Sequence, residues 1–274
     1  MNLSFFAEES VFVFGSNRQG IHGAGAALFA AKHRGAQAGQ GEGMHPAKGF
    51  AGQSYALPTK HGPHDPAPNF ALLQESVARF LEFAQARPWL SFMVTRVGCG
   101  LAGFTDAQVS PLFAQVPANC HLPGIWRTNH VPLIVAGSRG ISEEETGHHL
   151  DEQVSPDFRG EIVSGMARGV DRSGAQWAKT HHLPLVEAPA LWGRYGRAAG
   201  LIRNQWMAWY ATHLIAIWDG QSRGTQSMIR TAERDRLDVR VVLTEPPQPH
   251  EAYCGQRGYR DIPCRVQPCT PHRA

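Results

Sequence analysis

Arginine and hydroxyl side chains gather in four turns of the second half of this 274-residue chain. The turns lie at Gly137, Gly165, Asp219 and residues 194–204. Their donors are the guanidinium groups and hydroxyls of Arg139, Arg168, Arg194, Arg197, Arg203, Arg223, Ser138, Ser164, Ser222 and Thr225. Such groups, together with main-chain N–H groups at helix starts, bind phosphate. The pattern predicts a phosphate cradle, although a single arginine of this kind is more often solvated or paired with a nearby acid.

The elements around these turns explain why the turns should meet. Buried strands are expected at 133–136, 160–163, 184–187, 213–218 and 239–243. They alternate with a helix that starts at Ser142 and with helices at 172–180, 202–210 and 227–236. Ser142 followed by three glutamates is typical of a helix start. Alternating strands and helices predict a parallel, doubly wound sheet, whose strand ends share one edge. The expected ligand contacts there are Gly137, Ser138, Arg139, Gly165, Arg168, Asp171, Arg203, Asn204, Asp219, Ser222, Gly224 and Thr225, with the two aspartates suited to ribose hydroxyls.

Neither of the two common phosphate-loop motifs is present in the second half. Residues 128–274 contain no Gly-x-Gly-x-x-Gly and no Gly-x-x-x-x-Gly-Lys-Ser/Thr. The usual dinucleotide and ATP sites are therefore disfavoured.

The first half repeats the arrangement of strand, glycine-rich turn and helix. Strands are expected at 11–14, 54–57 and 91–95, and helices at 23–31, 70–87 and 104–113, with a loop over 35–52. The glycine-rich turns offer Gly15, Ser16, Asn17, Gly23, Gly25, Gly98, Cys99, Gly100 and Leu101 as ligand contacts. Lys60 follows a strand end, where α/β proteins place ligands. Cys99 lies between two glycines, and we interpret it as a small residue lining a pocket rather than a nucleophile.

Together these patterns predict an α/β protein with two three-layer α/β/α domains. Residues 117–129 carry breaking residues and little periodicity, so the boundary is placed near Arg127. The domains are then 1–127 and 128–245, followed by a poorly ordered tail over 246–274 that is rich in proline, arginine and cysteine.

Composition narrows the class of protein. The formal net charge is +3 and only 18% of residues are charged, which disfavours a dedicated nucleic-acid binder. Five scattered cysteines favour a reducing compartment. With neither a signal peptide nor a membrane-length apolar run, we expect a cytoplasmic protein without membrane contact. The tail holds Cys254, Cys264, Cys269, His250 and His272, but their spacing fits no familiar zinc pattern, so neither a metal nor a cofactor is predicted.

Four motifs in the second half resemble the SLOG superfamily, the Rossmann-like fold of the DNA-processing protein A family and the Lonely Guy enzymes, and particularly its bacterial and phage branch. They are Val-Ala-Gly-Ser-Arg-Gly (135–140), Ser-Gly-Met-Ala-Arg-Gly-Val-Asp (164–171), Ala-Gly-Leu-Ile-Arg-Asn (199–204) and Trp-Asp-Gly-Gln-Ser-Arg-Gly-Thr (218–225). The resemblance implies binding of a nucleotide at these turns, and an association into homo-oligomers. Lonely Guy enzymes need a glutamate that the stretch 224–228 lacks, which favours binding over base cleavage.

Residues 11–126 resemble a macrodomain, the ADP-ribose-binding fold. The motifs are Phe-Gly-Ser-Asn (14–17), Gly-Ala-Gly-Ala-Ala (23–27), Leu-Pro-Thr-Lys (57–60) and Val-Gly-Cys-Gly-Leu-Ala-Gly (97–103). In the branch that removes ADP-ribose from carboxylates or DNA bases, the resemblance assigns the chemistry to a lysine matched by Lys60 and to an aspartate. The aspartate position is Ala102 here, and Asp106 is the nearest substitute.

The resulting expectation is a binder of ADP-ribose or a related NAD-derived nucleotide. It would either read ADP-ribose or, with Lys60 and Asp106 as catalytic residues, hydrolyse it from an ADP-ribosylated nucleic acid or protein. Two alternatives stay open. One is a non-catalytic sensor of a nucleotide signal, and the other is a nucleoside-monophosphate phosphoribohydrolase acting through the second half.

Overall fold

β1 (Val11–Asn17) is the central strand of the first of two sheets. The computed structural model describes residues 1–47, 53–65, 69–127 and 131–244. In the first sheet the order is β2-β3-β1-β4-β5, with β2 (Gly43–His45), β3 (Ser54–Lys60), β4 (Phe92–Val94) and β5 (Cys120–His121). β2 runs antiparallel to β3, and the other neighbours are parallel. The carboxyl ends of β1, β3 and β4 therefore share one edge.

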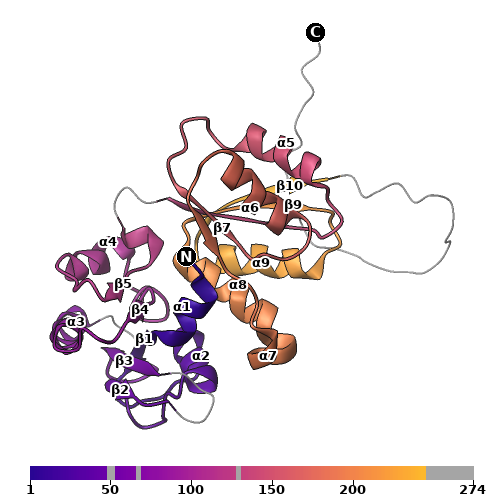
Figure 1. The fold of residues 1–274 in the computed structure, drawn as a ribbon. Helices are drawn as coiled ribbons and strands as arrows, with labels where there is room; N and C mark the ends of the chain where they lie inside the picture. Colours follow the sequence, from indigo (N-terminus) through magenta and orange to yellow (C-terminus); the bar gives the residue numbers. More distant parts are fainter. Residues whose placement is uncertain (48–52, 66–68, 128–130, 245–274) are drawn as a thin grey trace. The chain divides into compact units, whose positions relative to one another are not determined.

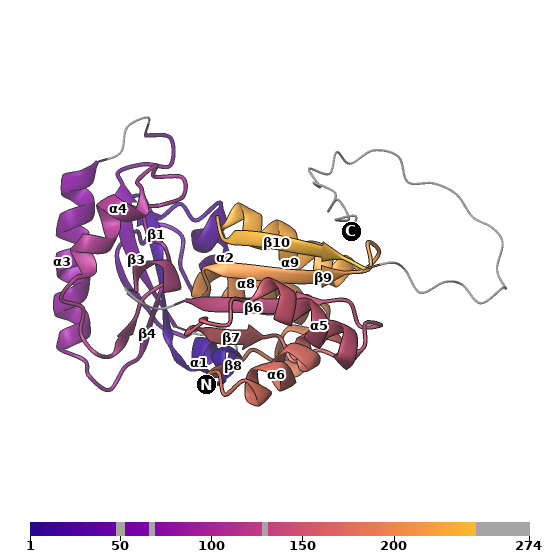
Figure 2. The ribbon, with the colours of Figure 1, turned by 90° about the horizontal axis from the view of Figure 1, so that it is seen from above.

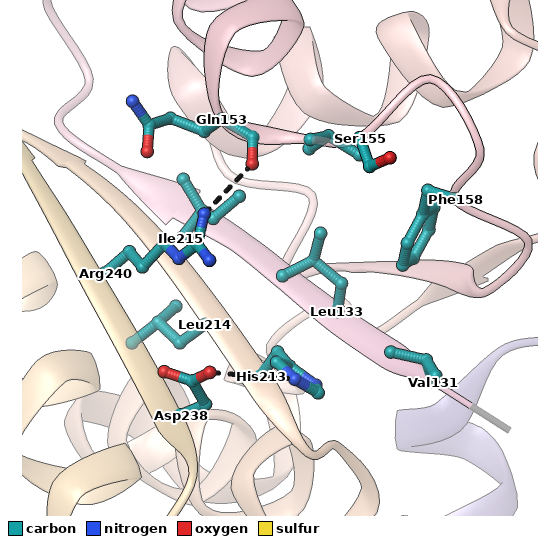
Figure 3. A pocket seen from close by; sticks show the side chains of 11 residues that line it. Val131, Leu133, Gln153, Ser155, Phe158, His213, Leu214, Ile215, Asp238 and Arg240 are labelled. Carbon is teal, nitrogen blue, oxygen red and sulfur yellow. Dashed lines mark hydrogen bonds and ion pairs between the residues drawn. The ribbon is translucent and has the colours of Figure 1, made fainter.

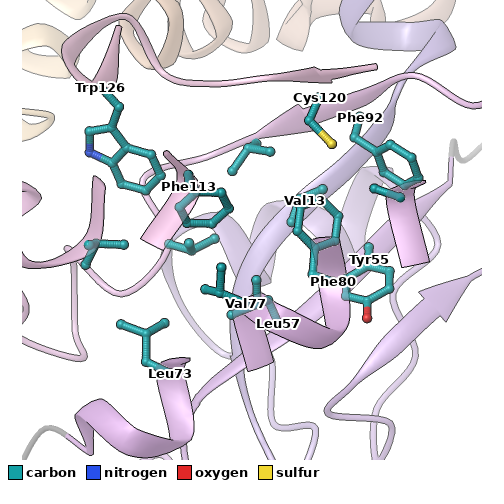
Figure 4. Packing of buried hydrophobic residues seen from close by; sticks show 14 of the residues in the cluster. Val13, Tyr55, Leu57, Leu73, Val77, Phe80, Phe92, Phe113, Cys120 and Trp126 are labelled. Atoms are coloured by element: carbon teal, nitrogen blue, oxygen red, sulfur yellow. The ribbon is translucent and has the colours of Figure 1, made fainter. Parts of the chain in front are cut away.

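The side chains of β1 alternate between two cores. Val11 and Val13 pack under α3 (Phe70–Gln85), which contributes Leu73 and Phe80 to the cluster in Figure 4. Asn69 caps α3 by accepting a hydrogen bond from the amide of Leu72. The opposite face of β1 packs against α2 (Gly25–His33) and against helices from elsewhere in the chain. α4 (Asp106–Val109) and the 3-10 helices at Ser110–Phe113 and Gly124–Trp126 close the first core.

The second sheet is wholly parallel, in the order β10-β9-β6-β7-β8 (Figures 1 and 2). Its strands are β6 (Pro132–Gly137), β7 (Glu161–Ser164), β8 (Leu185–Glu187), β9 (His213–Trp218) and β10 (Asp238–Leu243). α5 (Glu143–Gln153) and α6 (Val170–Thr180) cover one face, where they enclose Val135 and Ile215. α8 (Ala199–Tyr210) and α9 (Arg223–Arg234) cover the other face, over Ile134 and Ala216.

The two sheets share packed side chains within residues 1–244, which form one compact unit. Phe12 of β1 contacts Trp209 of α8, with ring centroids 5.1 Å apart. α1 (Leu3–Glu9) contributes Leu3 to the core of the second sheet and Ala7 to the core shared with the first. Ahead of α1, Asn2 forms a parallel bridge with Glu187 at β8. α7 (Trp192–Tyr195) and the 3-10 turn Gly196–Ala198 lead into α8.

The α/β class with helices layered on two sheets confirms the prediction from sequence. Gly15–Asn17, expected as a turn, instead continues β1, because its backbone pairs with β3 as far as Lys60. The loop expected over 35–52 contains β2, and the linker expected over 117–129 contains β5. The division at residue 127 remains a prediction, and the tail over 246–274 lies outside the described residues. None of the helices in the described ranges is both long and apolar enough for a bilayer crossing.

Candidate functional site

The strand order reverses between β6 and β9, and in open α/β sheets this topology leaves a crevice outside the carboxyl ends of the strands. From β6 the chain passes to α5 on one face of the sheet, and from β9 it passes to α9 on the other. The loops therefore diverge at this point, which is where open α/β sheets bind ligands. Ser138 joins the two strand ends: its amide donates to the Ile217 carbonyl (3.0 Å), and its hydroxyl accepts from the Asp219 amide (3.1 Å). The predicted turns at Gly137 and Asp219 are thus brought together.

Asp219 and Ser222 fix the start of α9. Asp219 Oδ1 accepts from the amides of Gln221 (2.9 Å) and Ser222 (2.8 Å). Partial burial acts against the ionised form, but these amide donors hold the pKa of Asp219 below its ordinary value. Ser222 Oγ in turn accepts from the amide and hydroxyl of Thr225. The carboxylate therefore shapes the turn, and Ser222 caps the first turn of α9.

Asp171 and Arg203 are held by each other and by the main chain. Asp171 Oδ2 lies 3.3 Å from Arg203 Nη1, and Asp171 Oδ1 accepts from the Gly137 amide at 3.2 Å. Arg203 also donates to the Gly165 carbonyl and to Asn204. Burial raises the pKa of Asp171, and the Arg203 guanidinium opposes that rise. The pair connects the ends of β6 and β7 with α8.

The same pair fills the space beside Gly165. A Cβ atom at Gly165 would lie 1.6 Å from Arg203 Nη1, so a larger residue there would displace the guanidinium from its place beside Asp171. The next residue, Met166, has a φ of 57°. Left-handed backbone is unusual for such a side chain and concentrates at functional sites. Arg203, Asp171 and Asn204, which the sequence predicts as ligand contacts, are thus engaged with protein groups.

Three other predicted arginines belong to the loops and the helix start at this edge of the sheet. Arg139, Arg168 and Arg223 are exposed, and none forms an ion pair with a described residue. Arg139 is close enough to Asp171 and Arg203 to influence the pKa of each. Arg194, in contrast, pairs with Glu8 of α1 at 2.6 Å. Gly140 and Gly224 lie in the same loops. A Cβ atom at Gly140 would meet nothing within 4 Å, and one at Gly224 would meet only Ser222 Oγ, at 4.0 Å.

The carboxyl edge of the first sheet brings together a second set of predicted residues. Lys60 Nζ, at the end of β3, donates to the Leu101 carbonyl at 3.3 Å. A Cβ atom on Gly15 would lie 3.4 Å from the Gly98 amide nitrogen. Gly98 has a φ of 79°. The turn at 97–101 therefore lies against β1 and reaches Lys60.

Open glycines surround this first-sheet edge. A Cβ atom at Gly23, Gly25 or Gly100 would meet nothing within 4 Å. α2 begins beside the first two glycines, and its cap residue, Ala24, offers no side-chain acceptor to the helix amides. Asn17 supports the approach to α2, since its amide group exchanges two hydrogen bonds with Ile21. The start of α2 is thus open to an anionic group.

Cys99 is buried, and Asp106 beside it is half-buried and has protein partners. Asp106 forms an ion pair with Arg96 and accepts from Trp126 Nε1 at 2.7 Å. Although burial opposes it, the donors from Arg96 and Trp126 lower the pKa of Asp106. Burial raises the pKa of the Cys99 thiol to about 12, with Asp106 adding to the effect. This geometry suits a structural role for Asp106 and leaves Cys99 an unreactive thiol.

A buried histidine pair beside β1 was not anticipated from the sequence. His22 Nε2 lies 3.0 Å from Ser16 Oγ, and its ring lies 6.0 Å from that of His45. Burial lowers the pKa of both histidines, that of His45 to about 4. Arg96 and Trp126, the partners of Asp106, were also missed. Each lies in a segment without periodicity, so its burial depends on contacts far along the chain.

Comparisons with known proteins identify no family for this chain. No protein-family model matches the chain, and no curated protein matches it. The resemblance to macrodomains and to the SLOG superfamily therefore stays a prediction. Among the residues that the structure describes, no group of three or more histidine, cysteine, aspartate or glutamate side chains could hold a metal ion. The cysteines and histidines of the tail lie outside those residues.

Proposed function

We propose that this protein binds ADP-ribose or a related NAD-derived nucleotide through the crevice between β6 and β9. One observation carries the proposal: Arg139, Arg168 and Arg223 surround the point where the strand order reverses, and no described side chain pairs with them. Exposed guanidinium groups beside a helix start are suited to a diphosphate.

Some residues at the crevice already have protein partners, which limits the groups that can contact the ligand. Arg223 and the amide of Gly224 belong to the first turn of α9, where the helix dipole favours an anion. Arg139 would bind the second phosphate from the β6 side. Asp171 and Arg203 would position the loops rather than contact the ligand, because each already has a charged partner.

A second candidate function is the hydrolysis of an ADP-ribosyl bond at the edge of the first sheet. It is favoured by the position of Lys60, whose ammonium group reaches the glycine-rich turn at Leu101. In this reaction water would add to the ribosyl C1 atom, the bond to the modified macromolecule would break, and the leaving atom would take up a proton. Asp106 is already paired with Arg96, so the proposal gives the polarising role to Lys60 alone.

Isothermal titration of the full chain with ADP-ribose tests the binding proposal. Replacing Arg139 or Arg223 by glutamine should weaken binding at least about tenfold, since each replacement removes charge-assisted hydrogen bonds. Arg230→Gln is the matched control, because Arg230 is exposed two turns further along α9. Its affinity should equal that of the unmodified chain.

The same titration distinguishes binding at the crevice of the second sheet from binding at the carboxyl edge of the first sheet. If Lys60→Ala weakens binding while Arg139→Gln and Arg223→Gln do not, the nucleotide binds at the first sheet instead. Release of ADP-ribose from a modified protein should then also be lost in Lys60→Ala. A folded chain that produces no heat with ADP-ribose, ADP or AMP would overturn the proposed function.

A further inference from the structure

A cavity of about 180 Å³ lies at the amino ends of β6, β9 and β10, the edge of the second sheet opposite to the nucleotide crevice. Figure 3 shows its lining. The walls are mostly apolar and come from Val131 and Leu133 before and within β6, from Ile215 of β9, and from Phe158 in the loop after α5. An apolar cavity of roughly 150 Å³ can take a benzene ring, so this one has room for a compact apolar group.

Two opposite charges stand side by side at the same cavity. Asp238 and Arg240 are two residues apart on β10, so their side chains share one face of the sheet. Val242, the next residue on that face, packs into the core under α5 and α6. In Figure 3 the two charged side chains lie on one side of the cavity and Phe158 lies across from them.

Both charged groups are oriented yet accessible. Arg240 Nη1 donates to the Gln153 carbonyl at the end of α5 (3.2 Å), which leaves the other guanidinium N–H groups for a ligand. Asp238 Oδ2 lies 3.8 Å from His213 Nε2, and the Asp238 side chain is 63% exposed. A pocket with apolar walls and a few placed polar groups is the usual form of a small-molecule site.

We propose that this cavity binds a free α-amino acid with an apolar side chain. The side chain would fill the space between Leu133, Ile215 and Phe158. The α-carboxylate would bind the Arg240 guanidinium, and the α-ammonium would bind the Asp238 carboxylate. A zwitterion can pair with both charged groups of β10 while its apolar part enters the cavity. This charge complementarity favours the amino acid over a simple acid or amine.

The site is independent of the proposed nucleotide crevice. Asp238 and His213 begin their strands, whereas Gly137 and Asp219 lie at or beyond strand ends. A residue of one site can therefore be changed without touching the other, and the two proposals can fail separately.

Titration of the full chain with L-phenylalanine and L-leucine tests the inference. Two analogues of phenylalanine each lack one charged group: 3-phenylpropanoate lacks the ammonium group, and 2-phenylethylamine lacks the carboxylate. We expect each analogue to bind at least about tenfold more weakly than phenylalanine. Asp238→Asn and Arg240→Gln should each weaken phenylalanine binding to a similar extent, while Arg230→Gln should leave it unchanged.

Methyl NMR shifts of Leu133 and Ile215 locate the bound ligand. Shifts that saturate with phenylalanine at these two residues support the site. Equal affinity for phenylalanine and both analogues would show an apolar pocket without amino-acid recognition, and the absence of binding by either amino acid to the folded chain would also overturn the proposal. ADP-ribose affinity measured on Arg240→Gln should be unaffected, so a failed nucleotide titration leaves this test intact.

Discussion

At the scale of residues, a side chain predicted to contact a ligand can instead be used to hold the fold together. Asp171 and Arg203 have the chemistry of ligand contacts, and their motifs place them at the correct strand edge. The structure uses them to tie two loops to α8, through the Gly137 amide and the Gly165 carbonyl. Arg139 and Arg223 come from the other two motifs of the same half and remain exposed. Only three-dimensional contacts separate the two pairs.

The buried histidine His45 should make stability depend on pH. Its Nδ1 accepts from the Gln37 amide (3.1 Å), so the neutral ring fits the site, and burial lowers its pKa to about 4. Since an unfolded histidine has a pKa of about 6.5, the unfolded chain binds more protons between these values. The stabilisation is complete above pH 6.5 and falls as the pH drops toward 4, by up to about 3 kcal/mol.

Urea unfolding from pH 4.5 to 7.5 measures this effect. In His45→Gln the unfolding free energy should vary less with pH than in the unmodified chain, and the remaining slope reflects groups such as His22. His148→Gln is the control, because the His148 side chain is 70% exposed. Parallel pH profiles for His45→Gln and the unmodified chain would contradict the prediction.

At the scale of elements, the features that depend on neighbouring residues in the sequence were predicted correctly. The cap at Ser142 was predicted from the acids that follow it, and its hydroxyl accepts from the Glu145 amide at 3.1 Å. The helix predicted over 70–87 from the spacing of its apolar residues is α3. β2 and β5 were missed, because each has at most three residues and exists only through a distant partner strand. The cavity beside β10 could not be predicted, since its walls come from four separate segments.

Two helix glycines offer a prediction about packing of α6 and α5 on the second sheet. A Cβ atom at Gly174 of α6 would lie 2.4 Å from Val135 Cγ1 of β6, whereas one at Gly147 of α5 would meet nothing within 4 Å. Gly174→Ala should therefore lower the unfolding free energy by about 1–3 kcal/mol through overpacking. Gly147→Ala should raise it by about 0.5–1 kcal/mol, because alanine favours the helix.

The double variant Gly174→Ala/Val135→Ala provides the check by denaturant unfolding. Removing the valine methyl groups should make the alanine at position 174 cost less than it does beside Val135. An unchanged cost in both backgrounds would show that the close approach to Val135 does not limit this position.

At the scale of the molecule, residues 1–244 are held together by side chains from both halves, which argues for a single cooperative unit. Trp206 of α8 is 1% exposed and belongs to the same cluster as Phe12 and Phe14 of β1. On the other side, Arg96 donates to the Asp235 carbonyl at the end of α9. α1 adds Glu8, which pairs with Arg34 of the first half and Arg194 of the second. Loss of packing at this junction should therefore weaken both sheets.

Native-state hydrogen exchange on Trp206→Phe tests this cooperativity. The smaller ring leaves a cavity, so we expect the free energy of global opening to fall by about 1–3 kcal/mol. The fall should be equal for amides of β1 and of β9, because the core around Trp206 contacts the first sheet while α8 also packs on the second. If protection fell in β9 alone while β1 kept its original value, the two halves would open independently, and the boundary expected near residue 127 would separate autonomous folding units.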